Sequence, residues 1–312
     1  MEKQKNIPQL RFPEFDGEWD KKMINDTCTI VGGGTPESGK DEFWNGNIQW
    51  FTPTEIKMDY VSKSERTITE LGLKKSSARL LPKGTILLTS RATIGEVAIA
   101  LNECTTNQGF QSLIVNKSYN SIFIFNWIKN NRNLFLRRAN GSTFLEINKS
   151  EIGTIHIFTP TLSEQQKIAS FFTAIDQKIS QLKRKKSLLE QYKKGVMQKI
   201  FLQEIRFRDD NGQEFPKWEK KKLKDVAEIK YGKDQKGIAC ENGKYPILGT
   251  GGIMGRTNEF LSDKPSVLIG RKGTIDKPLF IDTPFWTVDT LFYTIVISNV
   301  NPKWLYLSLI HI

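Results

Sequence analysis

Three polar side chains in short, glycine-punctuated segments have the chemistry to read the bases of a nucleic acid. Asn107 and Gln108 are adjacent in "TNQGF", and Arg91 stands in "TSRATIG". A side-chain amide can pair in bidentate fashion with adenine, and a guanidinium group can do so with guanine. A structural role is equally open for the two amides, because Asn and Gln also satisfy backbone groups in turns. These residue types indicate a binding site.

The sequence contains no recognisable set of residues for catalysis. A nuclease needs clustered carboxylates around metal ions, and a methyltransferase needs a glycine-rich cofactor loop after a strand. The run "GTGGIMG" from Gly249 lacks the required spacing, so we interpret it as a turn. His156 and His311 have no triad or metal partner at a recognisable spacing. We therefore expect a chain without enzymatic activity, metal or cofactor.

The charge of the chain favours a polyanionic partner. Lys and Arg number 46 against 34 Asp and Glu, which gives a net charge of +12. Such an excess favours binding to nucleic acid through neutralisation of phosphates. Cys28, Cys104 and Cys240 are isolated, and we expect them to be buried apolar residues. The N-terminal residues lack an apolar signal core and no apolar run has membrane-spanning length, so a cytoplasmic protein is expected.

Three segments of the chain recur in the same order. "EWDKKMINDTCTIVGG" from Glu18 resembles "KWEKKKLKDVAEIKYG", 199 positions later. "GTILLTSRATIGEVAI" resembles "SVLIGRKGTIDKPLF", which places Arg91 opposite Arg271. "TNQGFQSLIV" from Thr106 resembles "TVDTLFYTIV" from Thr287. Because the order is preserved across three matches, the sequence predicts a duplicated domain.

Residues 163–203 are predicted to form one long helix between the two copies. They contain no Pro, and Ser163 stands three residues before Gln166, as in a capping box. Apolar residues recur every seven positions, with a second row between them, which predicts the seam of a coiled coil. The seam residues, expected to form a partner interface, are Ile168, Phe172, Ile175, Ile179, Leu182, Leu189, Val196 and Ile200. Such a helix would be ~60 Å long and would need a partner helix. An ordinary amphipathic helix lying on one domain is the alternative.

The repeats and the helix together predict an α+β fold. Short β-branched and aromatic runs indicate strands in each copy, and one helix is expected over residues 122–138. We expect two homologous β-rich domains, at 1–162 and 204–306, separated by the coiled-coil helix at 163–203.

Several motifs in a fixed order resemble the specificity subunit of type I restriction-modification systems. They are "PQLRFPEFDGEW", "VGGGTP" followed by "WFTPTEI", "GSTFLEINKSEIGTIHI", and "LSEQQKIASFF" at the start of the long helix. The resemblance implies two target-recognition domains held apart by two antiparallel helices, each domain reading one half of a bipartite site on double-stranded DNA. It also implies modification subunits that dock on the helices and methylate adenine, restriction subunits that join through them, and no catalysis by the chain itself.

The second copy departs from this pattern at its end. It stops soon after "VDTLFYTIV", whereas the first copy continues into the long helix. We therefore expect a truncated second domain, an incomplete second helix, and self-association through the unpaired seam. Residues 307–312, "LSLIHI", match a translated sequencing adapter and are expected to be a non-native tail.

Loops on a rigid β scaffold are the natural carriers of side chains that read DNA. In the first domain the candidate DNA-binding residues are Thr35, Thr52, Thr54, Arg91, Thr93, Asn107 and Gln108. In the second domain they are Lys233, Arg256, Arg271 and Lys272, for which phosphate contacts are favoured over base contacts. A coiled-coil assembly protein without DNA readout is the alternative function. The duplicated basic domains on each side of a spacer favour the DNA-binding function, since two readers suit a bipartite site.

Overall fold

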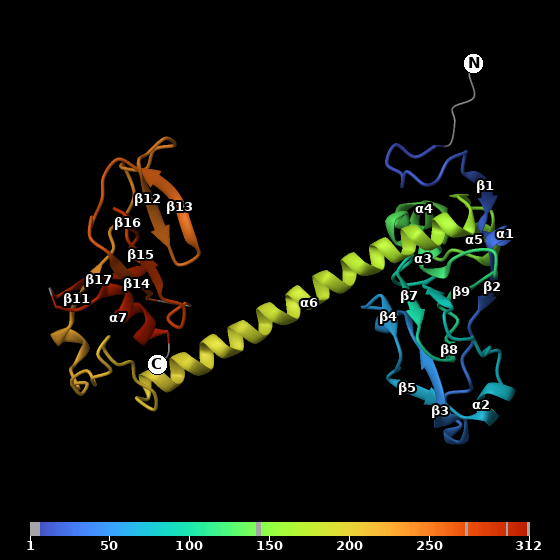
Figure 1. Ribbon diagram of the computed structural model, residues 1–312, viewed down its shortest axis with the longest axis horizontal. Coiled ribbons are helices and arrows are strands. Elements are labelled where there is room, and N and C mark those ends of the chain that lie inside the picture. The colour runs from blue at the N-terminus through green and yellow to red at the C-terminus, as the bar shows by residue number, and fades with distance from the viewer. Residues whose placement is uncertain (1–6, 142–144, 272–273, 298, 311–312) are drawn as a thin grey trace, which may run out of the picture. The chain divides into compact units, whose positions relative to one another are not determined.

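The computed structural model describes residues 7–141, 145–271, 274–297 and 299–310 (Figure 1). The chain divides into two compact units, 1–183 and 184–312, and one long helix, α6, continues from the first into the second. None of the helices in these described ranges combines the length and apolar character needed to cross a membrane.

Within its described residues, unit 1 contains three sheets. A five-stranded sheet has the order β2-β9-β6-β7-β4, a three-stranded sheet the order β5-β3-β8, and β1 pairs with β10. The strands are β1 Asp20–Met23, β2 Cys28–Gly32, β3 Trp44–Phe51, β4 Tyr60–Val61, β5 Arg66–Ile68, β6 Ile86–Leu88, β7 Val97–Ala100, β8 Cys104–Thr106, β9 Gln111–Val115 and β10 His156–Thr159.

Two helices cover the main sheet of unit 1 where a single helix was expected. The chain forms α3 (Ser121–Asn130) and α4 (Arg132–Arg138), which meet at Asn131. The Asn131 side chain donates to the carbonyl of Trp127 at 2.8 Å, and this bond ends the first helix. The apolar faces of both helices pack on strands β6 and β9 in the largest core cluster. The remaining helices are α1 Ile24–Thr27, α2 Glu70–Lys74, α5 Lys149–Gly153 and the 3-10 turns η1 Asp41–Phe43 and η2 Pro53–Glu55.

Unit 2 has a four-stranded sheet, β11-β17-β14-β15, and a three-stranded sheet, β13-β12-β16. The helix α7 packs on the first sheet through Leu305. The elements are η3 Leu223–Asp225, β11 Ala227–Tyr231, β12 Tyr245–Gly249, β13 Gly252–Thr257, β14 Ser266–Gly270, β15 Leu279–Ile281, β16 Trp286–Thr287, β17 Leu291–Val296 and α7 Pro302–Leu309. The first three residues of the tail expected at 307–312 thus lie in α7.

The two units share one topology, which confirms the α+β fold and the duplication. The order β2-β9-β6-β7 in unit 1 corresponds to β11-β17-β14-β15 in unit 2. The pair β3–β8 is parallel, and so is β12–β16. The pair β3–β5 is antiparallel, and so is β12–β13. One alignment from the sequence is wrong by a residue. The amide of Ser90 donates to the Gly109 carbonyl, and the corresponding amide in unit 2 is that of Arg271, which donates to Thr290. Ser90, not Arg91, is therefore the counterpart of Arg271.

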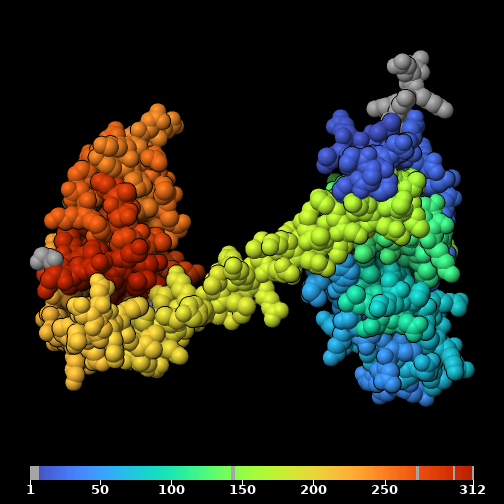
Figure 2. Space-filling model, viewed as in Figure 1, coloured from blue at the N-terminus to red at the C-terminus, as the bar shows by residue number. Residues whose placement is uncertain are grey.

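The long helix α6 spans Leu162–Phe201, 40 residues. Its predicted cap is wrong, because the hydroxyl that accepts from the Glu164 amide, at 3.4 Å, is that of Thr161 and not of Ser163. Glu164, Gln165 and Ala169 are buried in unit 1, whereas residues 174–194 are exposed at every position. Figure 2 shows this bare stretch in yellow-green. The helix is therefore anchored in unit 1 by its first turns.

Candidate nucleic-acid interface and the exposed face of the long helix

Four loops of unit 1 come together through backbone hydrogen bonds. They follow β2, β3, β6 and β8, and they carry all seven candidate residues of the first domain. The Gly34 amide donates to Thr106 at 2.8 Å, and the Asn107 amide donates to Phe51 at 2.9 Å. The Ser90 amide reaches the loop after β8 through its 2.7 Å bond to the carbonyl of Gly109. We call this group of loops the unit 1 loop cluster.

Thr35 and Gln108 are in direct contact within this cluster. The Thr35 hydroxyl donates to Gln108 Oε1 at 2.5 Å, and both residues are exposed. The Gln108 Nε2 group has no partner among the described residues and can donate outward. A base edge that approaches this pair would therefore meet one donor and one acceptor already held in place.

Asn107 has a structural role in its turn. Its Oδ1 accepts from the Gly109 amide at 2.8 Å. Bidentate pairing with adenine uses both the oxygen and the nitrogen of an amide. The oxygens of Asn107 and Gln108 each accept one hydrogen bond already, and the two amides differ in exposure, since Asn107 is half-buried and Gln108 is exposed.

Arg91 lies at the tip of the turn between β6 and β7. Its Nη2 is 2.8 Å from Glu146 Oε2, and the two side chains are 46% and 34% exposed. Ala92, the next residue, has a φ of 59°, in the left-handed region that non-glycine residues rarely adopt. The hydroxyl of Thr93, by contrast, is buried without a partner among the described residues. Of the two candidates in this turn, Arg91 is exposed and Thr93 is half-buried.

Thr52 is engaged within its own loop, and Thr54 is exposed. The Thr52 amide and hydroxyl both donate to Glu55 Oε2, at 2.6 and 2.8 Å, which forms the cap of the short turn η2. Beneath the same loop, Trp50 is buried and its indole Nε1 donates to the Gly34 carbonyl at 2.9 Å. The loop after β3 is thus fixed from both sides and presents Thr54 to solvent.

A group of buried polar atoms under the cluster was missed by sequence reasoning. Four side-chain oxygens near the ends of β6, β8 and β9 have no hydrogen-bond partner among the described residues, in addition to that of Thr93. They belong to Ser90, Thr106, Gln111 and Ser112. Buried polar groups are normally hydrogen-bonded, so these atoms mark a place that water or a ligand group can complete. Their signal in the sequence is the run of polar residues inside otherwise apolar strands.

A corresponding cluster exists in unit 2. The Lys233 amide donates to the Thr287 carbonyl at 2.9 Å, which matches the bond from Gly34 to Thr106. Lys233 and Arg271 are exposed, and the Arg271 guanidinium carbon lies 5.9 Å from the centre of the Tyr231 ring. Lys233 and Arg271 therefore correspond to Gly34 and Ser90, each of which directly precedes a candidate residue of unit 1.

The other two candidates of unit 2 are placed differently. Arg256 is on strand β13, where its side chain donates to the Gly243 carbonyl at 3.3 Å. Lys272 lies outside the described residues. In the described part of the chain, no group of His, Cys, Asp and Glu side chains is arranged to hold a metal ion. Cys240 is exposed, so its predicted burial is wrong, whereas Cys28 and Cys104 are buried as expected.

The predicted seam of α6 is exposed along the middle of the helix. Phe172, Ile175, Ile179, Leu182 and Leu189 are 39–55% exposed. The ends of the seam are half-buried: Ile168 packs against the core of unit 1, and Val196 and Ile200 lie in the last turns. Phe171, Leu188 and Tyr192 widen the apolar face beyond the predicted rows. An apolar face of this kind is suited to packing against another helix.

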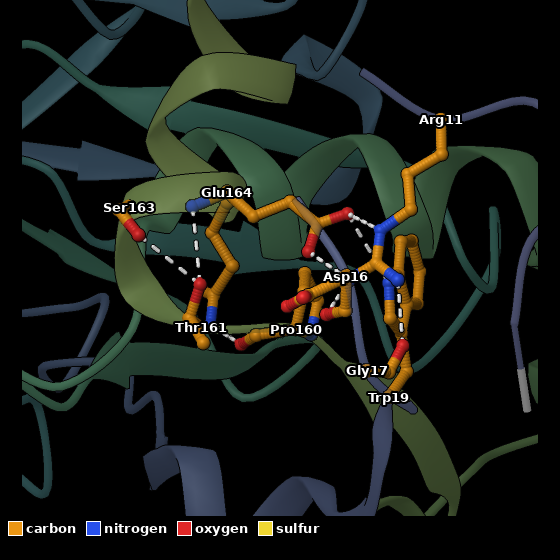
Figure 3. A network of polar contacts seen from close by, with 9 residues as sticks. Arg11, Asp16, Gly17, Trp19, Pro160, Thr161, Ser163 and Glu164 are labelled. Atoms are coloured by element: carbon orange, nitrogen blue, oxygen red, sulfur yellow. Dashed lines mark hydrogen bonds and ion pairs between the residues drawn. The ribbon is translucent and has the colours of Figure 1, made fainter. Parts of the chain in front are cut away.

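The first turn of α6 is held by an ion pair that sequence reasoning did not identify (Figure 3). Arg11 donates to both carboxylate oxygens of Glu164, from Nε at 2.8 Å and from Nη2 at 2.6 Å. It also donates to the carbonyls of Asp16 and Gly17, and Trp19 Nε1 donates to Glu164 at 3.3 Å. Hydrogen bonding to the carboxylate raises the pKa of Arg11 above its usual value. The N-terminal segment is thereby fastened to the start of the helix.

Comparisons with known proteins agree with this architecture. A family model described as the type I restriction modification DNA specificity domain matches residues 16–191 and again 216–312. The MjaIX specificity subunit of a type I restriction enzyme from Methanocaldococcus jannaschii is 37% identical over 246 residues, 74% of this chain and 57% of that protein. The MjaVIII specificity subunit from the same organism is 26% identical over 269 residues, 83% of this chain and 61% of the relative. The chain thus spans about three fifths of either relative.

One solved structure shares the fold over almost the whole chain. It is the S subunit of a type I restriction-modification system from M. genitalium, with a TM-score of 0.60 at 18% identity. The similarity covers 99% of this chain and 80% of the other.

Proposed function

Because the chain belongs to the type I restriction modification DNA specificity family, we propose that it is the non-catalytic specificity subunit of a type I restriction-modification complex. It would direct adenine methylation and restriction to a bipartite site on double-stranded DNA. The observation that carries this proposal is the pair of matching loop clusters on the same sheet topology. Two copies of one reading surface in one chain suit a target with two separate halves.

The exposed groups divide into two kinds that fit this role. Gln108 and Arg91 present amide and guanidinium groups able to pair with base edges. Lys233 and Arg271 present positive charge without a carboxylate partner among the described residues, which suits contact with phosphates. The net charge of +12 supplies the general attraction to DNA.

The exposed seam of α6 supports docking of modification subunits, through which restriction subunits would join. An apolar row along an otherwise charged helix provides a specific surface for another helix. The complex would meet DNA in the cytoplasm. The same seam also favours a second candidate function, a coiled-coil assembly protein that does not read DNA. The two functions differ in whether the loop clusters carry sequence preference.

The test is co-expression of the full chain with the modification subunit of a type I system, followed by co-purification and mapping of methylated adenines. We expect a stable complex and methylation at one bipartite sequence. A matched culture with Gln108→Ala and Arg91→Ala in the chain should retain the complex and lose or change one half of the sequence. A complex that forms normally but methylates no defined sequence would support the assembly function instead.

A further inference from the structure

The loop after β16 in unit 2 corresponds, bond by bond, to the loop after β8 in unit 1. Gln108 directly precedes the Gly109 carbonyl, which accepts from the loop after β6 at 2.7 Å. Asp289 directly precedes the Thr290 carbonyl, which accepts the equivalent bond from the loop after β14 at 2.9 Å. In both units the carbonyl three residues earlier accepts from the loop after β2 or β11. Asp289 is therefore the counterpart of Gln108, which carries an amide able to pair with a base.

The two counterparts differ in what holds them. Thr35 donates to Gln108, whereas the residue at the matching position, 199 places later, is Asp234. The Oδ1 of Asp234 accepts from the Lys236 amide at 3.1 Å. Asp289 is exposed, and its carboxylate has no hydrogen bond or ion pair with any described residue. Because an ionised carboxylate has only acceptors, Asp234 cannot hold Asp289, which is left open to a donor from a ligand.

A free carboxylate is an unfavourable group on a surface that binds DNA. It repels the phosphates and weakens binding to every sequence unless a specific contact compensates for the repulsion. Lys233 and Arg271 belong to the two loops that bond to the loop of Asp289, and their charges offset part of this effect. The position of Asp289 opposite Gln108 therefore favours a contact with the edge of a base.

The chemistry of a carboxylate selects one base among four. In the major groove guanine and thymine present acceptors, which a carboxylate repels. Adenine presents a donor at N6 beside an acceptor at N7, which suits an amide better than a carboxylate. Cytosine presents the N4 amino donor without an acceptor beside it, and Asp and Glu accept from this group. The ligand that fits Asp289 is therefore cytosine.

We propose that Asp289 reads a cytosine in the half-site bound by unit 2, with the N4 amino group donating to the carboxylate. Gln108 reads an adenine at the corresponding position in the half-site of unit 1. This inference rests on the proposed function and adds the base that unit 2 selects. The two halves of the target then differ at equivalent positions, with a C·G pair in one and an A·T pair in the other.

The test is mapping of methylated adenines after co-expression of the full chain with the modification subunit of a type I system. The half of the target that Gln108→Ala alters belongs to unit 1, and we expect the other half to require a cytosine. Asp289→Asn should shift this requirement from cytosine to adenine, because an amide pairs in bidentate fashion with adenine. Asp289→Ala should remove the requirement, and neither variant should change the half read by unit 1.

Asp282→Asn is the matched control, since it removes the same charge from another exposed residue of unit 2. Asp282 follows Ile281, which pairs with Ser266 at the start of β14, whereas Arg271 follows the end of that strand. The control thus lies at the opposite end of the sheet from the loop of Asp289. It should leave both halves of the methylated sequence unchanged.

Fluorescence anisotropy with DNA duplexes separates a base contact from an effect of charge. Thymine in place of the cytosine sets the O4 acceptor against the carboxylate and should weaken binding of the wild-type complex roughly fivefold or more. The same exchange should leave binding of the Asp289→Ala complex unchanged. Random duplexes should bind this variant more tightly than the wild type, because a repulsive charge has been removed. Equal tightening on all duplexes, without loss of preference, would show that Asp289 only repels phosphates and would overturn the proposal.

Failure of this inference can be distinguished from failure of the proposed function. A defined methylated sequence that Asp289→Asn leaves unaltered would overturn the inference alone. A wild-type complex that methylates no defined sequence would overturn the proposed function and the inference with it. Because Asp289 is exposed and has no partner among the described residues, both variants should remain folded, which co-purification with the modification subunit checks.

Discussion

At the scale of single residues, Arg91 is the group whose role in DNA binding can be measured most directly. Its ion pair with Glu146 is half exposed, and such pairs contribute little, about 0–1 kcal/mol. A guanine edge can therefore displace the carboxylate at small cost. The pair keeps the guanidinium extended at the tip of its turn when no DNA is bound.

We expect Arg91→Ala to weaken binding to the specific site by about 1–3 kcal/mol, the range for loss of a bidentate contact with guanine. Titrations of specific and random duplexes at one salt concentration measure the effect. Lys117→Ala, an exposed cation outside the cluster, is the control. Equal losses on both duplexes would show that Arg91 contacts a phosphate.

Because Cys28 and Cys104 are buried, we expect the stability of the first unit to decrease at alkaline pH. Desolvation raises the pKa of Cys28 from 9.0 to about 11 and that of Cys104 to about 12. Because the folded-state pKa of each thiol is raised, the free energy of unfolding is highest below pH 9. It falls as the pH rises toward 11 for Cys28 and toward 12 for Cys104. For Cys28 the loss amounts to about 3 kcal/mol of unfolding free energy.

Urea unfolding of the chain at pH 8.5 and pH 10.5 measures this dependence. Cys28→Ala should reduce the difference between the two pH values, because the unfolded-state thiolate is removed. Exposed Cys240 provides the control, and Cys240→Ala should leave the difference unchanged. An identical pH dependence in the Cys28→Ala protein would contradict the assignment.

At the scale of elements, α6 joins a buried start to an exposed apolar face. Aspartate at Ile175 and Leu182 would place two charges in the seam, where packing against another helix excludes water. We expect the wild-type chain to self-associate and the double variant to sediment as a monomer. Gln177→Asp and Gln181→Asp, on the opposite face by heptad position, should leave association unchanged. A wild-type chain that sediments as a monomer would argue against an adhesive seam.

Periodicity predicted this helix, but its ends depend on contacts that a local pattern does not contain. The seven-residue repeat and the lack of Pro placed the helix within a residue of its observed start. The cap itself was mispredicted, because Thr161 and Ser163 both carry a hydroxyl and the local sequence does not distinguish between them. The break at Asn131 was likewise missed, because its cause is one side-chain bond to the preceding turn.

The candidate loops illustrate the same limit. Residue type and the neighbouring glycines located all four loops of unit 1, and the structure brings them together. The orientation of each side chain could not be predicted, since it is set by partners far away in sequence, such as Thr35 for Gln108 or Glu146 for Arg91.

At the scale of the whole molecule, we expect the residues of the two loop clusters to be of two kinds. Some read base edges, and others attract the phosphates of DNA by their charge. Lys233 belongs to the second kind, and we expect Lys233→Ala to weaken binding to all sequences alike. The slope of log K against log salt concentration should fall in magnitude by about 1. Glu241→Gln, which removes an exposed charge of opposite sign in the same unit, should not reduce that slope. A change of sequence preference in the Lys233→Ala protein would instead indicate base contact.

The ion pair between Arg11 and Glu164 also affects how the chain folds during synthesis. Its partners are 153 positions apart. At a translation rate of about 5–20 residues per second, the guanidinium waits roughly 8–30 seconds before its carboxylate has been made. Until then Arg11, Phe12 and Trp19 lack their contacts with α6. The N-terminal segment can therefore complete its contacts with the first turn of α6 only after Glu164 has been synthesised.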